Sequence, residues 1–548
     1  MPPGRDRPLS GDRTPAAAAG LADLTRFWVL AGLLALLAAQ PLARELDRPY
    51  YGLHGLDQAH NAWLARAHVV YGLGYTHGYG TFAVGNPPPA DPERYLDHPP
   101  LYALLNAAAM ALLGAEVSTL RLVNLVATAV ALLLFVGLVR RLADEATALF
   151  AGFVFACLPL VGYFGIEYWL YPVVFVAYGR YLDLAEADAP PPARKLAALG
   201  GLLFLAVQLA WVGCFFAAAL GVDLAARALR ARRRPSLRLL AALSVAPAIS
   251  LALDFVVLAA GGGWSFRRLF ELAAWRAGSG ERAVHEWGPW LAQLGEHAVA
   301  DFTWIVLLLA AGYLLVAPWR TRARSRPAEV ATTAGALPGL ALFLTPAVLQ
   351  ILVLKGTVWE HEWWLRPLAP FVALAAGCAL STSTRGLARR SPRAATAAAV
   401  LAVAAVFFAG ARGTDRFYAV RHYYPARLEL FDSLRDEMRP DQTLLSFESY
   451  RFEQKPGVKQ GSLRPEVAWH LDRDIVVARQ LDEIEAAAAS GRFAFYLMPA
   501  EHAKEEVDRY LGWLREQLRA RYRSRLVRAD PDQWLFDLRG GADEERAP

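Results

Sequence analysis

The chain has 548 residues, 55% of them hydrophobic, and its mean hydropathy is +0.25. Soluble proteins of this length rarely average so apolar, so the composition excludes an ordinary soluble protein and favours a polytopic membrane protein. The net charge of +6 does not indicate nucleic-acid binding, because the arginines occur in short clusters between apolar runs. The three cysteines each lie inside an apolar run, which argues against a disulfide framework.

Residues 1–25 are rich in Pro, Ala and Gly and are expected to be a disordered cytoplasmic N-terminus. Spanning a membrane takes roughly 20 residues, so the shorter apolar runs that follow must tilt or include flanking residues. We count eleven runs: 26–43, 119–139, 146–162, 167–183, 196–211, 212–229, 238–260, 300–318, 336–354, 364–381 and 394–411. We divide 196–229 near Trp211. A cleaved signal peptide is the alternative for the first run, but its long, partly acidic N-terminal region argues against it.

The loops between these runs differ in charge according to the side of the membrane on which they are expected to lie. With the N-terminus inside, all five inner loops are basic: Arg140/Arg141, Arg194/Lys195, Arg230–Arg234, Arg320–Arg326 and Arg385–Arg393. This is the positive-inside pattern of membrane proteins. It requires that Leu101–Leu113, which has only 13 residues and follows two prolines, is an interfacial or re-entrant helix. The first outer loop is therefore long, about residues 44–118.

Beyond Gly410 the composition changes, and residues 412–548 are charged and lack a spanning run. Stretches with strand-like and helix-like patterns alternate there. The strand-like stretches are 443–447, 475–478, 493–498 and 533–536, and the helical ones are 426–438, 481–489 and 501–518. These patterns predict a small extracytoplasmic α/β domain.

The first outer loop carries two motifs with possible chemistry. In residues 57–68, Asp57, Asn61 and His68 fall near one face of a helix, and a carboxylate there can act as a base. The alternative is that Asp57 only caps the helix. In residues 95–101, two prolines fix the direction of Asp97 and His98, which suits phosphate binding and proton handling. The alternative is a proline-initiated helix with an acid at its N-terminus.

Further polar residues lie at the outer ends of spans. Arg121 opens the second span, with Asn124 one turn below, and an arginine inside a membrane usually has a function or a partner, although snorkelling is possible. Glu167 lies at the outer end of the fourth span. Residues 355–367 combine Lys355, His361, Glu362 and Arg366 with Glu360 and three tryptophans, which indicates a polar pocket rather than only an aromatic belt. The histidine spacing of a zinc protease is missing, so no metal is indicated.

Together these motifs resemble the GT-C class of polyprenyl-phosphate-sugar-dependent glycosyltransferases. That class includes the bacterial protein O-mannosyltransferases and the lipid A aminoarabinose transferase. The resemblance covers about residues 26–411 by layout and is sharpest over residues 57–74, 98–101 with Arg121, and 355–370. Gln58 stands where the family motif usually has a second acid. Residues 465–473 also resemble the outer domain of such bacterial enzymes.

The resemblance implies a GT-C-like transmembrane catalytic domain at 26–411. It also implies inverting transfer of one sugar from a polyprenyl-phosphate donor to an extracytoplasmic lipid, glycan or protein. Asp57 would then be the base toward the acceptor, and Asp97 would orient His98 or help to engage the acceptor. The departing phosphate requires positive charge, for which Arg121 and His98 are the first candidates, followed by Lys355, His361 and Arg366. The three tryptophans would stack on the sugar or line the prenyl groove. No cofactor or metal is required.

The expected protein is thus a multi-pass bacterial inner-membrane enzyme with a cytoplasmic N-terminus and an extracytoplasmic C-terminal domain. Its partners would be the lipid-linked donor, an acceptor and membrane lipids, without nucleic acid. Two alternatives remain. A transporter or flippase of a lipid-linked sugar would show ionisable residues at mid-span and repeat symmetry, whereas Asp254 is the clearest such residue and no repeat is visible. A membrane anchor for a periplasmic binding module would not need eleven spans.

Overall fold

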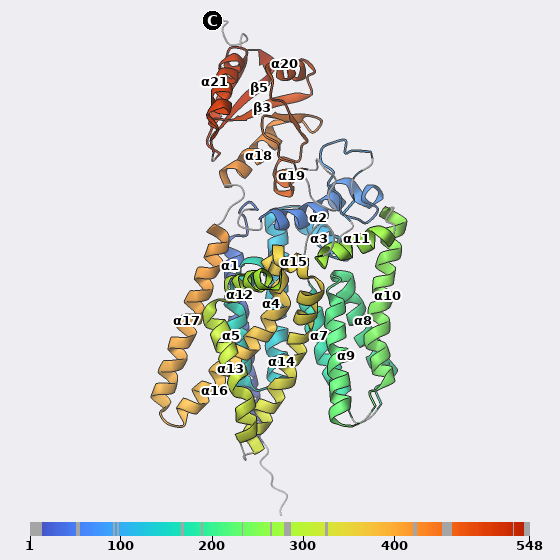
Figure 1. Ribbon diagram of the computed structural model, residues 1–548, viewed down its shortest axis with the longest axis vertical. Helices are drawn as coiled ribbons and strands as arrows, with labels where there is room; N and C mark the ends of the chain where they lie inside the picture. Colours follow the sequence, from blue (N-terminus) through green and yellow to red (C-terminus); the bar gives the residue numbers. More distant parts are fainter. Residues whose placement is uncertain are drawn as a thin grey trace, which may run out of the picture.

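The computed structural model describes residues 14–50, 55–90, 92, 94–95, 98–165, 169–187, 190–232, 234–262, 266–278, 286–323, 327–419, 425–451, 463–529 and 531–541. A bundle of long helices forms one end of the molecule, and the C-terminal domain stands on the other end (Figure 1). A layer of shorter helices lies between them. This intermediate layer contains most of the candidate site residues.

Each of the eleven apolar runs coincides with a helix of the bundle. These helices are α1 (Thr14–Arg44), α4 (Val117–Leu142), α5 (Glu145–Ala156), α7 (Leu170–Ala185), α8 (Ala193–Leu209), α9 (Gly213–Arg230), α10 (Leu237–Gly262), α13 (Trp304–Ala323), α14 (Pro327–Val353), α16 (Ala369–Ala388) and α17 (Pro392–Ala419). Within the described residues, five helices are long and apolar enough to cross a membrane by themselves. A sixth candidate is the pair α12 (Trp287–Phe302) and α13, which is bent by 106°. Eleven spans therefore stays a prediction.

The ends of these segments differ from the expectation in two places. Helix α1 begins at Thr14, within the segment 1–25 that was expected to be disordered, and the tract Ala16–Ala19 in its first turns has a high helix propensity. The run 146–162 is broken into α5 and α6 (Pro159–Phe164), since Pro159 occupies the first turn of a new helix. The expected division near Trp211 is confirmed, because α8 ends at Leu209 and α9 begins at Gly213.

The helix ends that border the basic loops lie at the end of the bundle opposite the C-terminal domain (Figure 1). Ion pairs connect helix ends there: Arg141 of α4 with Asp183 (2.5 Å) and Glu186 (2.8 Å), and Arg385 of α16 with Asp144 (3.0 Å). Arg140 lies 4.5 Å from the centre of the Phe27 ring on α1. The helices therefore share one basic face, as the loop charges predicted.

The intermediate layer consists of α2 (Gly55–Thr76), α3 (Leu101–Leu113), α11 (Phe266–Arg276), α12, α15 (Lys355–Glu360) and the 3₁₀ helix η1 (Glu362–Leu368). Helix α2 bends at Gly72, whose φ of 79° is accessible to glycine with little strain. Helix α3 has the bounds expected for the short interfacial segment. Its residues Ala107 and Met110 are buried in one cluster with Ala59, Ala62 and other residues of α2.

The C-terminal domain contains a five-stranded sheet in the order β2-β1-β3-β5-β4. The strands β1 (Thr443–Ser446), β2 (Ile475–Val477) and β3 (Phe493–Pro499) are parallel, and β5 (Gln533–Gly541) and β4 (Tyr522–Val527) add antiparallel pairs. Its helices are α18 (Pro425–Glu437), α19 (Pro465–Leu471), α20 (Leu481–Ala489) and α21 (Glu505–Arg519). Alternation along the strands gives the sheet two apolar faces. Tyr496 and Met498 face α20 and α21, whereas Phe495 and Leu497 share a core with α18, α19 and α2.

Candidate functional site

A small pocket, with a volume of about 50 Å³, opens where α1, α2, α3, α4, α6 and α17 meet. It is lined by Leu42, Tyr50, Gln58, Asn61, Tyr102, Leu120, Arg121, Asn124, Tyr163 and Tyr418. Gln58 and Asn61 belong to the first motif of the outer loop, whereas Arg121 and Asn124 begin the next long helix. The Nδ2 of Asn124 donates to the carbonyl of Phe164 (2.7 Å), which holds the end of α6 beside the pocket. The fold thus brings two separate motifs to one cavity.

Asp57 lies in the first turn of α2, directly beside this pocket. Asn61 donates its side-chain N–H to the backbone carbonyl of Asp57 (3.1 Å), so the two residues are fixed relative to each other. Glu466 of α19 is 1% exposed, and burial raises the pKa of its carboxyl, with Asp57 adding a smaller effect in the same direction. Asp57, the expected base, is therefore close enough to the C-terminal domain to influence the ionisation of one of its carboxyls. His68, further along α2, is buried, and its Nδ1 is hydrogen-bonded to the Thr76 hydroxyl at 2.8 Å.

Arg121 has a clear partner set in this structure. Its guanidinium donates to the carbonyls of Glu45, Arg48 (2.6 Å) and Pro49 (3.0 Å), directly after the C-terminus of α1. The cation also lies over the Tyr50 ring, 5.2 Å from its centre. Cationic side chains stabilise the carbonyl-rich end of a helix. Arg121 therefore fastens the end of α1 to α4, a role that neither phosphate binding nor snorkelling anticipated.

A second group of polar residues surrounds His98. The His60 ring is 4.5 Å from that of Tyr95, which in turn is 5.6 Å from the His98 ring. Burial lowers the pKa of His98 well below its usual value, and the positive charges of Arg276 and His60 add to this effect. Arg276 ends α11, and its backbone carbonyl is 3.4 Å from the hydroxyl of Thr357. Two outer loops, distant in sequence, thus place an arginine and two histidines together.

The charged residues of the motif at 355–367 contact several neighbouring helices, and the expected polar pocket stays a prediction. Lys355 is 8% exposed, and its Nζ lies 3.9 Å from the centre of the Trp287 ring and 5.5 Å from that of Trp290, both on α12. Arg366 is 7% exposed, and its guanidinium lies 5.0 Å from the centre of the Phe164 ring. His361 stacks on Trp363 at 4.1 Å. Lys355 therefore contacts the first turn of α12, whereas Arg366 contacts the end of α6.

Arg366 belongs to a buried charged cluster with Glu362 and Asp301. Asp301 is fully buried at the end of α12, and both Glu362 and Arg366 act on it electrostatically. Buried charges require compensation, so the arginine offsets the two acids. The tryptophans of this motif, Trp359, Trp363 and Trp364, pack against the bundle core. This packing supports η1, and stacking on the sugar or lining a prenyl groove stays a prediction.

Two of the predicted site residues, Asp97 and Glu167, lie outside the described residues. His60, Arg276 and Asp301 were missed by the sequence analysis. His60 lies inside the first motif, so its spacing from Asp57 was an available signal. No such signal marked Arg276 or Asp301. Arg276 is a single charge in a mixed-charge loop and Asp301 a single charge at the edge of an apolar run, and both resemble ordinary surface residues. Within the described residues, no group of three His, Cys, Asp or Glu is placed to hold a metal.

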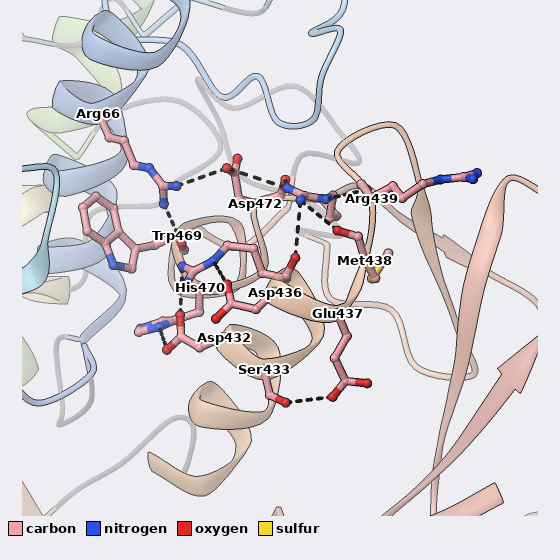
Figure 2. A network of polar contacts seen from close by, with 12 residues as sticks. Arg66, Asp432, Ser433, Asp436, Glu437, Met438, Arg439, Trp469, His470 and Asp472 are labelled. Carbon is pink, nitrogen blue, oxygen red and sulfur yellow. Dashed lines mark hydrogen bonds and ion pairs between the residues drawn. The ribbon is translucent and has the colours of Figure 1, made fainter. Parts of the chain in front are cut away.

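The C-terminal domain is fastened to the motif-bearing helix α2. Arg66 of α2 donates to the carbonyl of Trp469 (2.8 Å) and pairs with Asp472 (3.1 Å), as Figure 2 shows. Its guanidinium also lies 5.1 Å from the centre of the Trp469 ring. Asp472 neighbours Arg473, which donates to the carbonyls of Arg439 (3.0 Å) and Met438 (3.3 Å). The network therefore continues from α2 through α19 to the end of α18.

Comparison with known proteins supports a common architecture. The profile of the family described as dolichyl-phosphate-mannose-protein mannosyltransferase matches residues 97–178. This segment contains the Asp97-His98 motif, Arg121 and Glu167. No curated protein matches the chain significantly.

Solved structures resemble the whole chain. ArnT from Cupriavidus metallidurans, bound to undecaprenyl phosphate, aligns with a TM-score of 0.57 and 14% identity, covering 93% of this chain and 98% of that one. The oligosaccharyltransferase of Archaeoglobus fulgidus in the apo form has a TM-score of 0.51 and 12% identity, covering 91% and 73%. Archaeoglobus fulgidus AglB in complex with an inhibitory peptide and a dolichol-phosphate also has a TM-score of 0.51 and 12% identity. The resemblance predicted from the sequence is thus confirmed, and the chain has the fold of the GT-C class of polyprenyl-phosphate-sugar-dependent glycosyltransferases.

Proposed function

We propose that this protein transfers one sugar from a polyprenyl-phosphate donor to an acceptor outside the cytoplasm, with inversion at the transferred carbon. The observation that carries the proposal is that Gln58 and Asn61 of α2 and Asn124 of α4 converge on one small pocket, with Asp57 next to Gln58 in the first turn of α2. It lies at the end of the bundle that faces the C-terminal domain, within the fold of a protein solved with undecaprenyl phosphate. A prenyl tail in the membrane would hold the reacting carbon at this level.

Asp57 is the proposed base toward the acceptor nucleophile. Its position in the first turn of α2 favours the ionised carboxylate, because helix N-termini stabilise negative charge. His60 follows on the next turn of the same helix and joins the Tyr95–His98 group by ring contacts. Asp57 and His60 are therefore carried by one helix, and the ring contacts of His60 would set the position of the base relative to His98.

The leaving phosphate is proposed to contact His98 and Arg276. Since the pKa of His98 is lowered, its imidazole would enter the reaction neutral and donate one hydrogen bond, while Arg276 supplies the positive charge. Lys355, His361 and Arg366 would act mainly by positioning α15 and η1. Arg121 would maintain the outer end of α1. Asp97 and Glu167 remain proposed site residues that the geometry does not address, and no metal or cofactor is part of the proposal.

We place the protein in a bacterial inner membrane, with the basic face of the bundle in the cytoplasm and the C-terminal domain outside. The transport alternative receives little support. Asp254, the mid-span acid, accepts hydrogen bonds from Gln208 (2.7 Å) and Trp211 (3.1 Å), which gives it a structural role between α8 and α10.

The test is mass spectrometry of lipids, glycans and glycoproteins from a deletion strain. The strain is complemented with the wild type, Asp57→Asn or Asp47→Asn, and membrane insertion is checked for each. Asp47 is an exposed acid of the same outer segment and serves as the matched control. In the deletion strain we expect one sugar to disappear from one acceptor and its polyprenyl-phosphate form to accumulate. The wild type and Asp47→Asn should restore the sugar to the acceptor, whereas Asp57→Asn should not. Full rescue by correctly inserted Asp57→Asn would remove the assigned base, and an unchanged deletion strain would contradict the transfer.

A further inference from the structure

A depression on the C-terminal domain is large enough for a ligand and is unrelated to the pocket at α2. Its volume is about 670 Å³, within the range of roughly 300–1,000 Å³ that is usual for ligand sites. It lies between α20 and α21 and is lined chiefly by Arg479, Gln480, Asp482, Glu485, Tyr510 and Trp513. These helices form the end of the domain that points away from the membrane bundle, whereas α19 forms the end that contacts it (Figure 1).

Two aromatic rings form an open platform in this depression. Tyr510 and Trp513 on α21 are 36% and 46% exposed, and their ring centres are 5.6 Å apart at an interplanar angle of 30°. The apolar face of α21 is made by Leu511, Leu514 and Leu518, which are buried against the sheet. The two rings lie outside that core face, so they are not required to cover it. Exposed aromatic pairs of this kind commonly mark binding sites.

The platform is held in place by hydrogen bonds of the loop that precedes α20. The Tyr510 hydroxyl donates to the carbonyl of Arg479 (2.7 Å). The carboxylate of Glu483 accepts from the backbone N–H groups of Arg479 (2.9 Å) and Gln480 (3.1 Å), which completes a capping box. The site is therefore preorganised, which reduces the entropy lost when a ligand binds.

The side chains around the platform are planar and polar and carry both charge signs. Arg479 is a donor, Asp482 and Glu485 are acceptors, and Gln480 is both. Glu485 also pairs with Arg521 at 2.8 Å. A sugar ring matches this combination, because its C–H face can lie on an aromatic ring while its hydroxyl edge donates and accepts hydrogen bonds. A purely apolar partner would displace the water around these polar groups without replacing its hydrogen bonds.

We infer that the depression between α20 and α21 binds a neutral oligosaccharide, as a docking site for the outer part of the acceptor glycan. The two carboxylates on its rim disfavour acidic sugars. The identification of the ligand as acceptor rests on the proposed function, whereas sugar binding itself does not. Because α20 and α21 lie at the end of the domain away from the bundle (Figure 1), the bound glycan has to extend from the transfer pocket along the C-terminal domain, which favours an oligomeric acceptor.

The test is saturation-transfer difference NMR on the full chain in lipid nanodiscs, without maltoside detergents, whose sugar head groups would compete. The probes are neutral trisaccharides of glucose, mannose, galactose and N-acetylglucosamine, and an unstructured peptide of similar size. The variants are Trp513→Ala, Trp513→Phe and the control Leu526→Ala, an exposed apolar residue of β4 outside the depression. Folding of each variant is checked by thermal unfolding.

We expect at least one trisaccharide to receive saturation from the wild type. Its binding should be at least tenfold weaker in Trp513→Ala and unchanged in Trp513→Phe and Leu526→Ala. Absence of saturation for every trisaccharide in the wild type, an equal signal in folded Trp513→Ala, or a response to the peptide alone would overturn the inference. The measurement needs neither donor nor transfer, so its failure leaves the proposed sugar transfer standing. An unchanged deletion strain, which would contradict the transfer, would likewise leave the binding result intact.

Discussion

Arg66 of α2 and Asp472 after α19 form an ion pair of 3.1 Å across the boundary between the intermediate layer and the C-terminal domain. The two side chains are only 13% and 17% exposed, so water screens their interaction weakly. Because α2 also carries Asp57 and His60, the position of these site residues depends on how firmly the C-terminal domain holds α2. This relationship between domain docking and site geometry can be measured directly.

Arg66→Met is expected to loosen α19 without unfolding the bundle. The variant loses two charge-assisted hydrogen bonds, each contributing about 1.5–3 kcal/mol, and leaves Asp472 partly buried without its partner. Amide hydrogen exchange of residues 465–471 should accelerate at least tenfold. Arg44→Met is the control, since Arg44 pairs with Asp415 at 3.7 Å where the side chains are 52% and 65% exposed. Equal exchange in the two variants would contradict the role of Arg66.

The buried Glu466 predicts a specific pH dependence of stability. Burial raises its pKa above the ordinary 4.5, so its stabilising contribution is present below pH 4.5 and is lost as the pH rises through the folded-state pKa. Glu466→Gln cannot ionise and should therefore gain thermal stability relative to the wild type between pH 4 and 7. The control is Glu483→Gln. Backbone N–H groups lower the pKa of Glu483, so this variant should instead lose stability relative to the wild type as the pH rises. Parallel curves for both variants would exclude the assigned effect.

Arg121→Met is expected to lower the free energy of unfolding by about 2 kcal/mol in the absence of substrate. The reason is that three carbonyls after α1 lose their shared donor. Arg48→Met, which changes a side chain 60% exposed in the same segment, should stay within about 0.5 kcal/mol of the wild type. Thermal unfolding in nanodiscs measures both. An unchanged stability of Arg121→Met combined with a higher KM for the lipid donor would instead favour direct phosphate binding.

Close packing of α5 on α16 predicts that Gly377 does not tolerate a methyl group. A Cβ at Gly377 would lie 2.6 Å from the backbone nitrogen and 2.7 Å from the Cα of Ala151, so the helices would have to separate. Gly377→Ala should destabilise the bundle by about 1–3 kcal/mol. Gly386→Ala in the same helix meets nothing within 4 Å and should be neutral or stabilising, by up to about 1 kcal/mol. Similar unfolding temperatures for the two variants would contradict the close approach.

The local pattern of the chain predicted the long helices and most of the strands. Apolar runs predicted the bundle helices, and basic loops such as Arg140/Arg141 predicted which helix ends lie together, because hydropathy and loop charge act over one segment at a time. Alternation predicted β1, β2, β3 and the first part of β5. Strand β4 was missed because charged and polar residues interrupt its apolar ones. It lies at an edge of the sheet, where the two faces of a strand differ little in burial.

Only the tertiary structure decided which polar residues meet. The sequence contained Arg121, but not the carbonyls of Glu45, Arg48 and Pro49 that surround it, because those carbonyls belong to the preceding span. It likewise gave no sign that Arg276 lies beside His98, or that α19 fastens α2 through Arg66. Such contacts join residues tens to hundreds of positions apart, and their partners are selected by helix packing rather than by any local periodicity. The sequence by itself determined the helices and the outer motifs, and packing alone determined which charges became a site and which became supports.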